Sequence, residues 1–352
     1  MKTISFFSLV IVSLFYSGCR GKDSHDNSGS VIANGQMPGL VKDNSNDLYL
    51  VYGNEDSLMY TYSKDQGKSF SLPSLITVLP HLAASHTRGP QIAVSDNGLT
   101  VIACNESGDI FSFNKNQEGG WSQTVRVNDV DTVAKEGLMA LGGDGKNVFA
   151  AWLDLRNGHN QIYSSGSVDG GKTWSKNSLI YASPDIAVCE CCKPSVAVKG
   201  DNVYVMFRNW LNGNRDMYLI TSADGGSNFG TAQKLGNGSW ALEGCPMDGG
   251  NLAVNKNGHP ETVWLRQKKI YACEPGAGEK EIGEGRSCTI ESINGRNVYA
   301  WTEHGEIVVM NSQNIKRSIG KGGSPQLKAI SDKQVICVWE NEKQIHSAVL
   351  EL

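Results

Sequence analysis

The chain is built from short apolar runs that are separated by polar turns rich in glycine. Clear examples of these runs occupy residues 47–52, 148–152, 203–207 and 334–339. Few stretches show the longer period of an amphipathic helix. Short apolar runs with frequent turns are typical of antiparallel sheets, and the 40 Gly residues agree with many turns. The pattern therefore predicts an all-β fold.

One turn pattern occurs three times, each time directly after such a run. Residues 63–70, 167–174 and 222–229 all read Ser-x-Asp-x-Gly-x-(Ser/Thr/Asn)-aromatic. The Asp carboxylate can accept backbone N–H groups across a tight hairpin, and Gly supplies a positive φ. Three copies in register predict a repeat protein. The residues expected to be structural in these turns are Ser63, Asp65, Gly67, Ser167, Asp169, Gly171, Trp174, Ser222, Asp224 and Gly226.

This turn resembles the Asp box, or BNR repeat, of sialidases and many related β-propellers. The third copy departs from the family pattern at Asn228, where Ser or Thr is usual. The resemblance implies a propeller of four-stranded antiparallel blades. It says little about activity, because one fold carries many functions.

The apolar runs divide the chain into seven units. Four units begin near Pro38, Pro90, Leu138 and Pro194, and three more follow up to the C-terminus. The seventh unit lacks its last strand, which residues 30–33 can supply. Strands from both ends would then close the ring and leave no open edge. Seven blades are expected, although the sialidases of the family have six, so six stays an alternative.

The N-terminal segment has the features of an export signal. A short apolar run follows a charged start, and it ends in Ser17, Gly18 and Cys19. This resembles a bacterial lipobox, with Tyr16 in place of the usual Leu, and implies lipidation at Cys19. We expect a signal peptide over 1–18, a flexible tether over 19–30 and one propeller domain over 31–352. Ordinary secretion without a lipid is the alternative.

The amino-acid composition limits the classes of partner that we expect the protein to bind. The net charge is −4 and no basic stripe occurs, so nucleic acid is not an expected partner. We expect a monomeric exported lipoprotein that contacts the membrane through its lipid alone, on the periplasmic or cell-surface side. A glycan or another small ligand is the expected partner.

The predicted ligand face carries the loops opposite the Asp boxes. In a propeller the B–C and D–A loops emerge on that face, and here they are rich in charged and aromatic residues. For any single residue a solvated turn is the alternative interpretation, but together they favour a ligand site. The candidate ligand-binding residues are Arg88, Asp154, Arg156, His159, Arg208, Trp210, Arg215, Asp216, Glu243 and Asp248.

Nine Cys residues are present, and four of them fall in corresponding loops of adjacent units. One or two disulfides are expected among Cys189, Cys191, Cys192 and Cys245. The alternative is a Zn(II) or Cu(I) site, to which His86 or His159 could add a ligand; no other cofactor is expected. A further bridge is predicted between Cys273 and Cys288. Cys104 and Cys337 are expected to be buried thiols.

The sequence lacks part of the sialidase signature. The family holds its substrate carboxylate with three Arg and uses a Tyr–Glu pair and an Asp acid, but the family's Arg-Ile-Pro motif is missing. Its nearest equivalent is Arg88-Gly89-Pro90. We therefore expect a glycan-binding propeller, with an exo-sialidase-type glycoside hydrolase as one alternative and a metal-binding protein as another.

Overall fold

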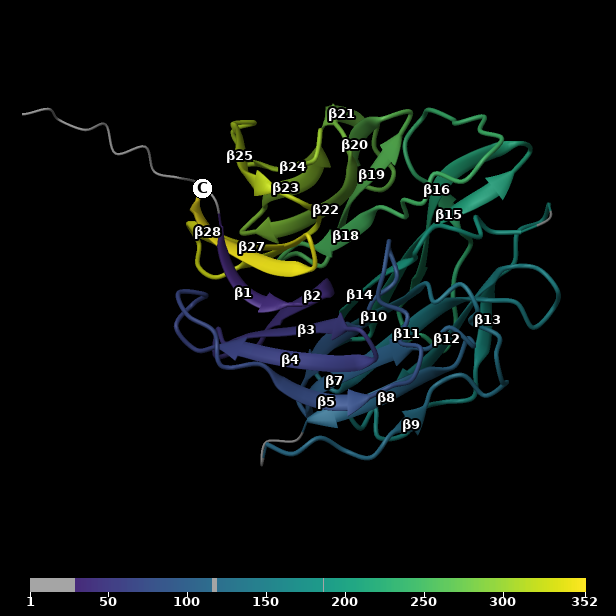
Figure 1. Cartoon of the computed structure of the whole chain (residues 1–352). Coiled ribbons are helices and arrows are strands. Elements are labelled where there is room, and N and C mark those ends of the chain that lie inside the picture. Colours follow the sequence, from purple (N-terminus) through teal and green to yellow (C-terminus); the bar gives the residue numbers. More distant parts are fainter. Residues whose placement is uncertain (1–28, 116–118, 186) are drawn as a thin grey trace, which may run out of the picture.

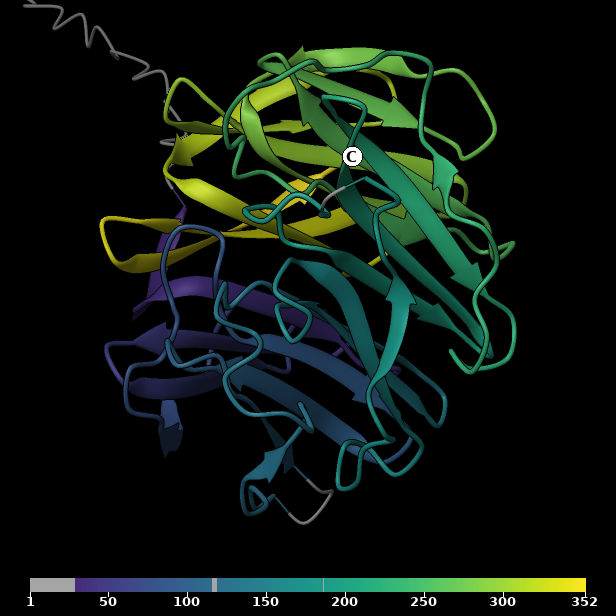
Figure 2. The same ribbon diagram turned by 90° about the vertical axis from the view of Figure 1, so that its right-hand side faces the viewer.

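The computed structural model describes residues 29–115, 119–185 and 187–352. The predicted signal peptide, most of the tether and Cys19 lie outside these residues. Seven four-stranded antiparallel sheets form a ring, with the blue blades below and the green and yellow blades above (Figure 1). The same division is visible after a 90° turn (Figure 2). The innermost strand of each sheet contacts the innermost strands of both neighbours, so the ring is continuous.

The strands follow one another outward within each of the first six blades. Blade 1 contains β2 (Gln36–Lys42), β3 (Leu48–Asn54), β4 (Ser57–Ser63) and β5 (Ser74–Val78). Blade 2 contains β6 (Gln91–Ser95), β7 (Gly98–Cys104), β8 (Ile110–Lys115) and β9 (Val125–Arg126). Blade 3 contains β10 (Met139–Asp144), β11 (Asn147–Asp154), β12 (Gln161–Ser167) and β13 (Ser178–Tyr181).

The second half of the ring repeats this order. Blade 4 contains β14 (Ser195–Lys199), β15 (Asn202–Leu211), β16 (Asn214–Ser222) and β17 (Gln233–Lys234). Blade 5 contains β18 (Asn251–Val254), β19 (Pro260–Arg266), β20 (Lys269–Cys273) and β21 (Lys280–Glu284). Blade 6 contains β22 (Arg286–Ile293), β23 (Arg296–Glu303), β24 (Glu306–Met310) and β25 (Lys316–Lys321). No helix among the described residues has the length and apolar character needed to cross a membrane.

Blade 7 is assembled from both ends of the chain. It contains β26 (Gly323–Ala329), β27 (Gln334–Asn341), β28 (Gln344–Glu351) and, on the outside, β1 (Ser30–Asn34). Ser30 lies opposite Ser347, and Asn34 lies opposite Gln344. Figure 1 shows the purple β1 against the yellow β28. The predicted closure and the count of seven blades are confirmed, and six blades are excluded.

The hydrophobic core lies between neighbouring blades rather than at the ring centre. The second strand of each blade supplies its most buried side chains, among them Trp152, Trp301 and Trp339. Trp152 packs against Ile102 and Ile110 of the preceding blade. Each blade therefore buries both faces, and its apolar runs are short and nearly continuous for this reason.

The three Asp-box turns have the predicted hydrogen bonds. The Asp65 carboxylate accepts bonds from the Ser69 side chain and N–H and from the Ser63 hydroxyl. These bonds lower the pKa of Asp65 to about 2, the Ser69 side chain acting most strongly. Asn228 donates from its side-chain amide to Asp224 Oδ2 over 2.7 Å, as Thr173 donates from its hydroxyl to Asp169. Asn228, which stands where the family pattern has Ser or Thr, therefore preserves the turn.

Candidate functional site

The loop face brings the predicted cysteine and arginine residues together beside blades 4 and 5. Arg215, at the start of β16, places Nη1 3.1 Å from Cys189 Sγ and 3.3 Å from Glu190 Oε2. Its guanidinium also lies over the Trp210 ring, 4.4 Å from the ring centre. Guanidinium and sulfur groups therefore lie side by side in these loops.

Arg208 lies under this cluster, and its guanidinium donates hydrogen bonds to backbone carbonyl groups. Its side chain is 1% exposed and donates to three carbonyl groups. Nε and Nη2 donate to the Asp248 carbonyl over 3.1 and 3.0 Å. Nη1 donates to the Arg215 carbonyl over 2.8 Å, and Nη2 also donates to the Leu265 carbonyl over 2.8 Å. Arg208 therefore links blade 4 to blade 5 and presents no donor to a ligand.

Most of the other predicted acidic residues are also engaged within the fold. Asp248 is 3% exposed and accepts the N–H groups of Gly250 and Ser287. Asp216 accepts the Trp240 N–H and forms an ion pair with Lys234 over 2.8 Å. These carboxylates position the loops between blades 4, 5 and 6.

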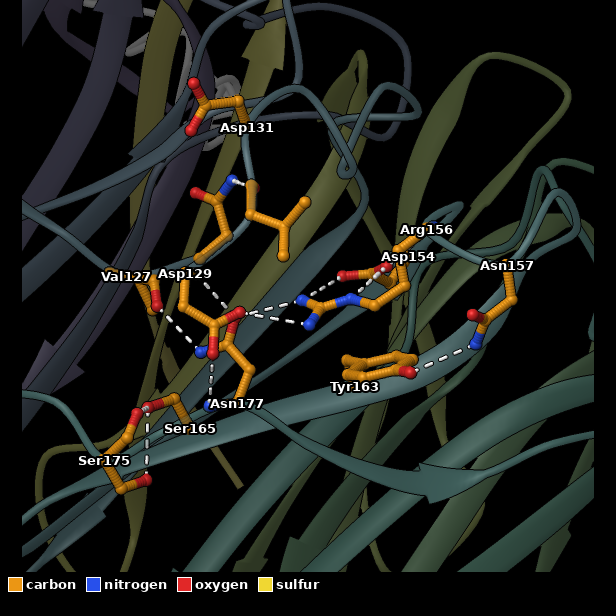
Figure 3. A network of polar contacts seen from close by, with 12 residues as sticks. Val127, Asp129, Asp131, Asp154, Arg156, Asn157, Tyr163, Ser165, Ser175 and Asn177 are labelled. Atoms are coloured by element: carbon orange, nitrogen blue, oxygen red, sulfur yellow. Dashed lines mark hydrogen bonds and ion pairs between the residues drawn. The ribbon is translucent and has the colours of Figure 1, made fainter.

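Asp154 and Arg156 form a separate network between blades 2 and 3 (Figure 3). The buried Asp154 carboxylate accepts bonds from Trp152 Nε1 and from Nε and Nη2 of Arg156. Arg156 also pairs with Asp129 over 3.0 Å and lies over the Tyr163 ring. These partners hold the Arg156 side chain between the two blades.

The remaining candidates lie apart from one another. Arg88 donates to the Glu136 carbonyl over 2.6 Å and pairs with its carboxylate. His159 contacts Gln161 in blade 3, and Glu243 is exposed on the loop that follows Trp240. In the described part of the chain, therefore, Arg88, Arg156, Arg208 and Arg215 do not converge with free guanidinium groups in one pocket.

The cysteine cluster combines one disulfide with two thiols. Cys191 and Cys245 are bonded, which confirms that a disulfide joins these loops. Cys189 and Cys192 are free and buried, with their sulfur atoms 3.1 Å apart. The contact with Cys192, aided by the charge of Arg215, lowers the pKa of Cys189 to about 7, whereas burial raises the pKa of Cys192.

The predicted Cys273–Cys288 bridge is wrong. Both residues are free and buried. Cys273 packs with Met206 in the core between blades 4 and 5, and Cys288 packs with Trp301 in the core between blades 5 and 6. The two thiols therefore lie on opposite faces of blade 5. Cys104 and Cys337 are buried thiols, as predicted.

The ring encloses a central channel that the sequence analysis did not assign. It has a volume of about 470 Å³ and is lined by the innermost strands of all seven blades. Lys193, next to the cysteine cluster, reaches Gln91 across its mouth with Nζ to Oε1 at 3.3 Å. Burial lowers the pKa of Lys193 to about 8.

A second cavity, of about 660 Å³, lies between blades 1 and 2. Tyr49 and Tyr62 are cross-strand neighbours in it, and both are half-buried. Tyr60 lies on the same side of β4 beneath Lys115, whose Nζ is 4.8 Å from its ring centre. Lys64 is exposed at the rim. Tyr60 and Tyr62 alternate along one strand, and this spacing is the sequence signal that could have indicated a shared aromatic face.

No protein-family model and no curated protein matches the sequence. Solved structures match the fold. The BP39L lectin from Burkholderia pseudomallei aligns with a TM-score of 0.64 at 9% identity, over 92% of this chain and 97% of that chain. AofleA from Arthrobotrys oligospora aligns with a TM-score of 0.52 at 10% identity, over 92% and 88%. The NanB sialidase from Streptococcus pneumoniae gives a TM-score of 0.46 at 13% identity, over 92% and 71%.

Proposed function

We propose that the protein is an exported, membrane-anchored propeller that binds a glycan. The observation that carries this proposal is the aromatic groove between blades 1 and 2, defined here by Tyr49, Tyr60, Tyr62, Lys64 and Lys115. The likeness in fold to a protein described as a lectin supports the proposal.

The groove has the chemistry that a sugar ring requires. The half-buried rings of Tyr49 and Tyr62 offer apolar surface against which the C–H face of a sugar can pack. Asp43 accepts the Tyr49 hydroxyl over 2.9 Å and so fixes the orientation of that ring. Exposed polar groups of Lys64 and Asp96 at the rim can bond to sugar hydroxyls. Aromatic rings provide packing surface for a small ligand, and polar groups placed around them fix its orientation.

The loop face, where the sequence analysis placed the ligand, is the weaker location. Trp210 is half-buried there, but the Arg215 guanidinium lies over its ring. Arg208, Asp216 and Asp248 are held by groups of the protein itself. Arg208, Asp216 and Asp248 on this face are therefore not free to bind a ligand.

A glycan array, followed by calorimetry on the best glycan, tests the proposal. We expect binding by the wild-type protein and a loss of about tenfold or more in affinity for Tyr49→Ala combined with Tyr62→Ala, since each aromatic contact contributes roughly 0.5–1.5 kcal/mol beyond its buried area. Trp210→Ala is the matched control and should leave the affinity unchanged. Binding that is lost in the control but kept in the double variant would place the glycan on the loop face. An array without any bound glycan would reject glycan binding.

The membrane anchor needs its own test, because Cys19 lies outside the described residues. The pattern Ser17-Gly18-Cys19 after an apolar run supports it. We expect the wild-type chain to take up labelled fatty acid and to sediment with membranes, and Cys19→Ser to do neither. A wild-type chain without label, recovered in the soluble exported fraction, would indicate ordinary secretion.

A further inference from the structure

We propose that Cys189, Cys191 and Cys192 form a binding site for monovalent copper, and that the disulfide between Cys191 and Cys245 is its oxidised, metal-free state. This cluster lies on the loop face between blades 4 and 5, far along the ring from the aromatic groove of blades 1 and 2. The proposal therefore does not depend on glycan binding.

The spacing of the sulfur atoms fits one shared ion. Cys189 Sγ lies 3.7 Å from Cys191 Sγ and 3.1 Å from Cys192 Sγ, and the Cys191 and Cys192 sulfurs are 4.0 Å apart. Metal–thiolate bonds of about 2.3 Å place neighbouring sulfurs of a trigonal or tetrahedral site roughly 3.8 Å apart. Three buried sulfurs from one four-residue turn thus already surround a point that an ion can occupy.

The chemistry around the sulfurs favours a soft ion. Met247, from the same loop as Cys245, packs against Cys189, Cys191 and Cys192. A thioether beside thiolates selects monovalent copper over harder ions. The nearby carboxylate of Glu190 is paired with Arg215 over 3.3 Å, so a competing oxygen ligand is already engaged.

Two buried guanidinium groups compensate the charge of the filled site. Three thiolates with one monovalent cation carry two negative charges, which would be costly in a buried position without positive neighbours. Arg215 touches Cys189 Sγ over 3.1 Å and is 3% exposed. Arg208 donates to the Arg215 carbonyl and lies directly behind it.

The disulfide decides whether the site can form, because it removes Cys191 from the ligand set. Cys245 is exposed, so a thiolate from a dithiol reductant can attack its sulfur. The reductant sulfur bonds to Cys245, and Cys191 leaves as a thiolate that takes up a proton. The second thiol of the reductant then displaces Cys245, which also takes up a proton. Two electrons and two protons reach the protein, and the reductant becomes a disulfide.

Anaerobic titration of the full chain in detergent with Cu(I), against a chromophoric Cu(I) chelator, tests the proposal. After reduction with a dithiol and removal of the reductant, we expect one Cu(I) per chain and a thiolate-to-copper charge-transfer band. Before reduction, the affinity should be lower by at least about tenfold. A reduced protein that binds no Cu(I), or that binds it equally in both states, overturns the proposal.

Variants locate the ion and identify it. Cys189→Ser and Cys192→Ser should each weaken Cu(I) binding by at least about tenfold, whereas Cys337→Ser, another buried thiol in blade 7, should leave it unchanged. Met247→Leu should weaken Cu(I) binding and leave Zn(II) binding unaffected. Equal losses in the Cys189 and Cys337 variants would reject this site. A parallel titration that shows Zn(II) retained and Cu(I) excluded would reject the assignment of copper.

Discussion

Replacing Arg208 by alanine is expected to lower the free energy of unfolding by about 3–5 kcal/mol. The side chain is buried and donates to the carbonyls of Asp248, Arg215 and Leu265, which come from different blades. Alanine leaves these carbonyls without donors, and each unsatisfied buried group costs roughly 1–3 kcal/mol. Urea unfolding followed by tryptophan fluorescence measures the change.

Two further substitutions make the Arg208 experiment specific. Arg208→Lys should recover only part of the lost stability, because an ammonium group cannot reach three carbonyls in the planar geometry of the guanidinium. Arg317→Ala, on the exposed strand β25, should change the unfolding free energy by less than about 0.5 kcal/mol. If Arg208→Ala were as mild as Arg317→Ala, the assignment of Arg208 as an inter-blade clamp would be wrong.

The fold could be predicted from the sequence because a propeller is made of local contacts. Each blade is a run of neighbouring hairpins. The apolar runs and the Asp boxes in the sequence therefore indicate directly where each blade lies along the chain. The turn around Asp224 needs only residues within four positions of it, and Asn228 could therefore be assigned to the same turn. The closing strand was also predictable, since a seventh unit that lacks its outer strand requires a partner from the other end of the chain.

The site could be predicted only in outline, because its contacts join distant segments. Arg208 reaches Asp248 and Leu265, which lie 40 and 57 positions away, and nothing near Arg208 in the sequence reveals these acceptors. A count of charged residues on the loop face therefore overestimates the groups that can bind a ligand. The groove needs residues from two blades, Tyr62 and Lys115 among them, and only the ring brings them together.

The error at Cys273 and Cys288 has the same origin. The sequence correctly places these residues in adjacent blades, but a blade has two faces and each face lies in a different core. A shift of one residue along a strand reverses the face that a side chain occupies. The presence of two Cys residues in adjacent blades is therefore not enough to predict a disulfide between them. The Cys191–Cys245 bond formed because both residues lie in loops that meet above the sheets.

Deleting residues 30–34, which form β1, is expected to destabilise the whole ring by several kcal/mol and to cause self-association. Without β1, strand β28 becomes an open edge whose backbone groups can pair with another copy. The deletion also removes Ala33 from a core that includes Ile345 and Val338. Urea unfolding should give a lower midpoint, and sedimentation should show oligomers that grow with protein concentration.

Two controls separate loss of the strand from loss of chain length. A deletion of the same length within the predicted tether, over residues 22–26, should leave both the unfolding midpoint and the sedimentation behaviour unchanged. A synthetic peptide covering residues 29–35 should restore the midpoint of the shortened chain, because an added strand can pair with β28 in trans. A shortened chain that stays monomeric with an unchanged midpoint would show that contacts between the innermost strands hold the ring closed without β1. Closure by the terminal strand would then have no role in stability. Another feature of the chain would have to explain why the open edge of β28 does not pair with a second copy.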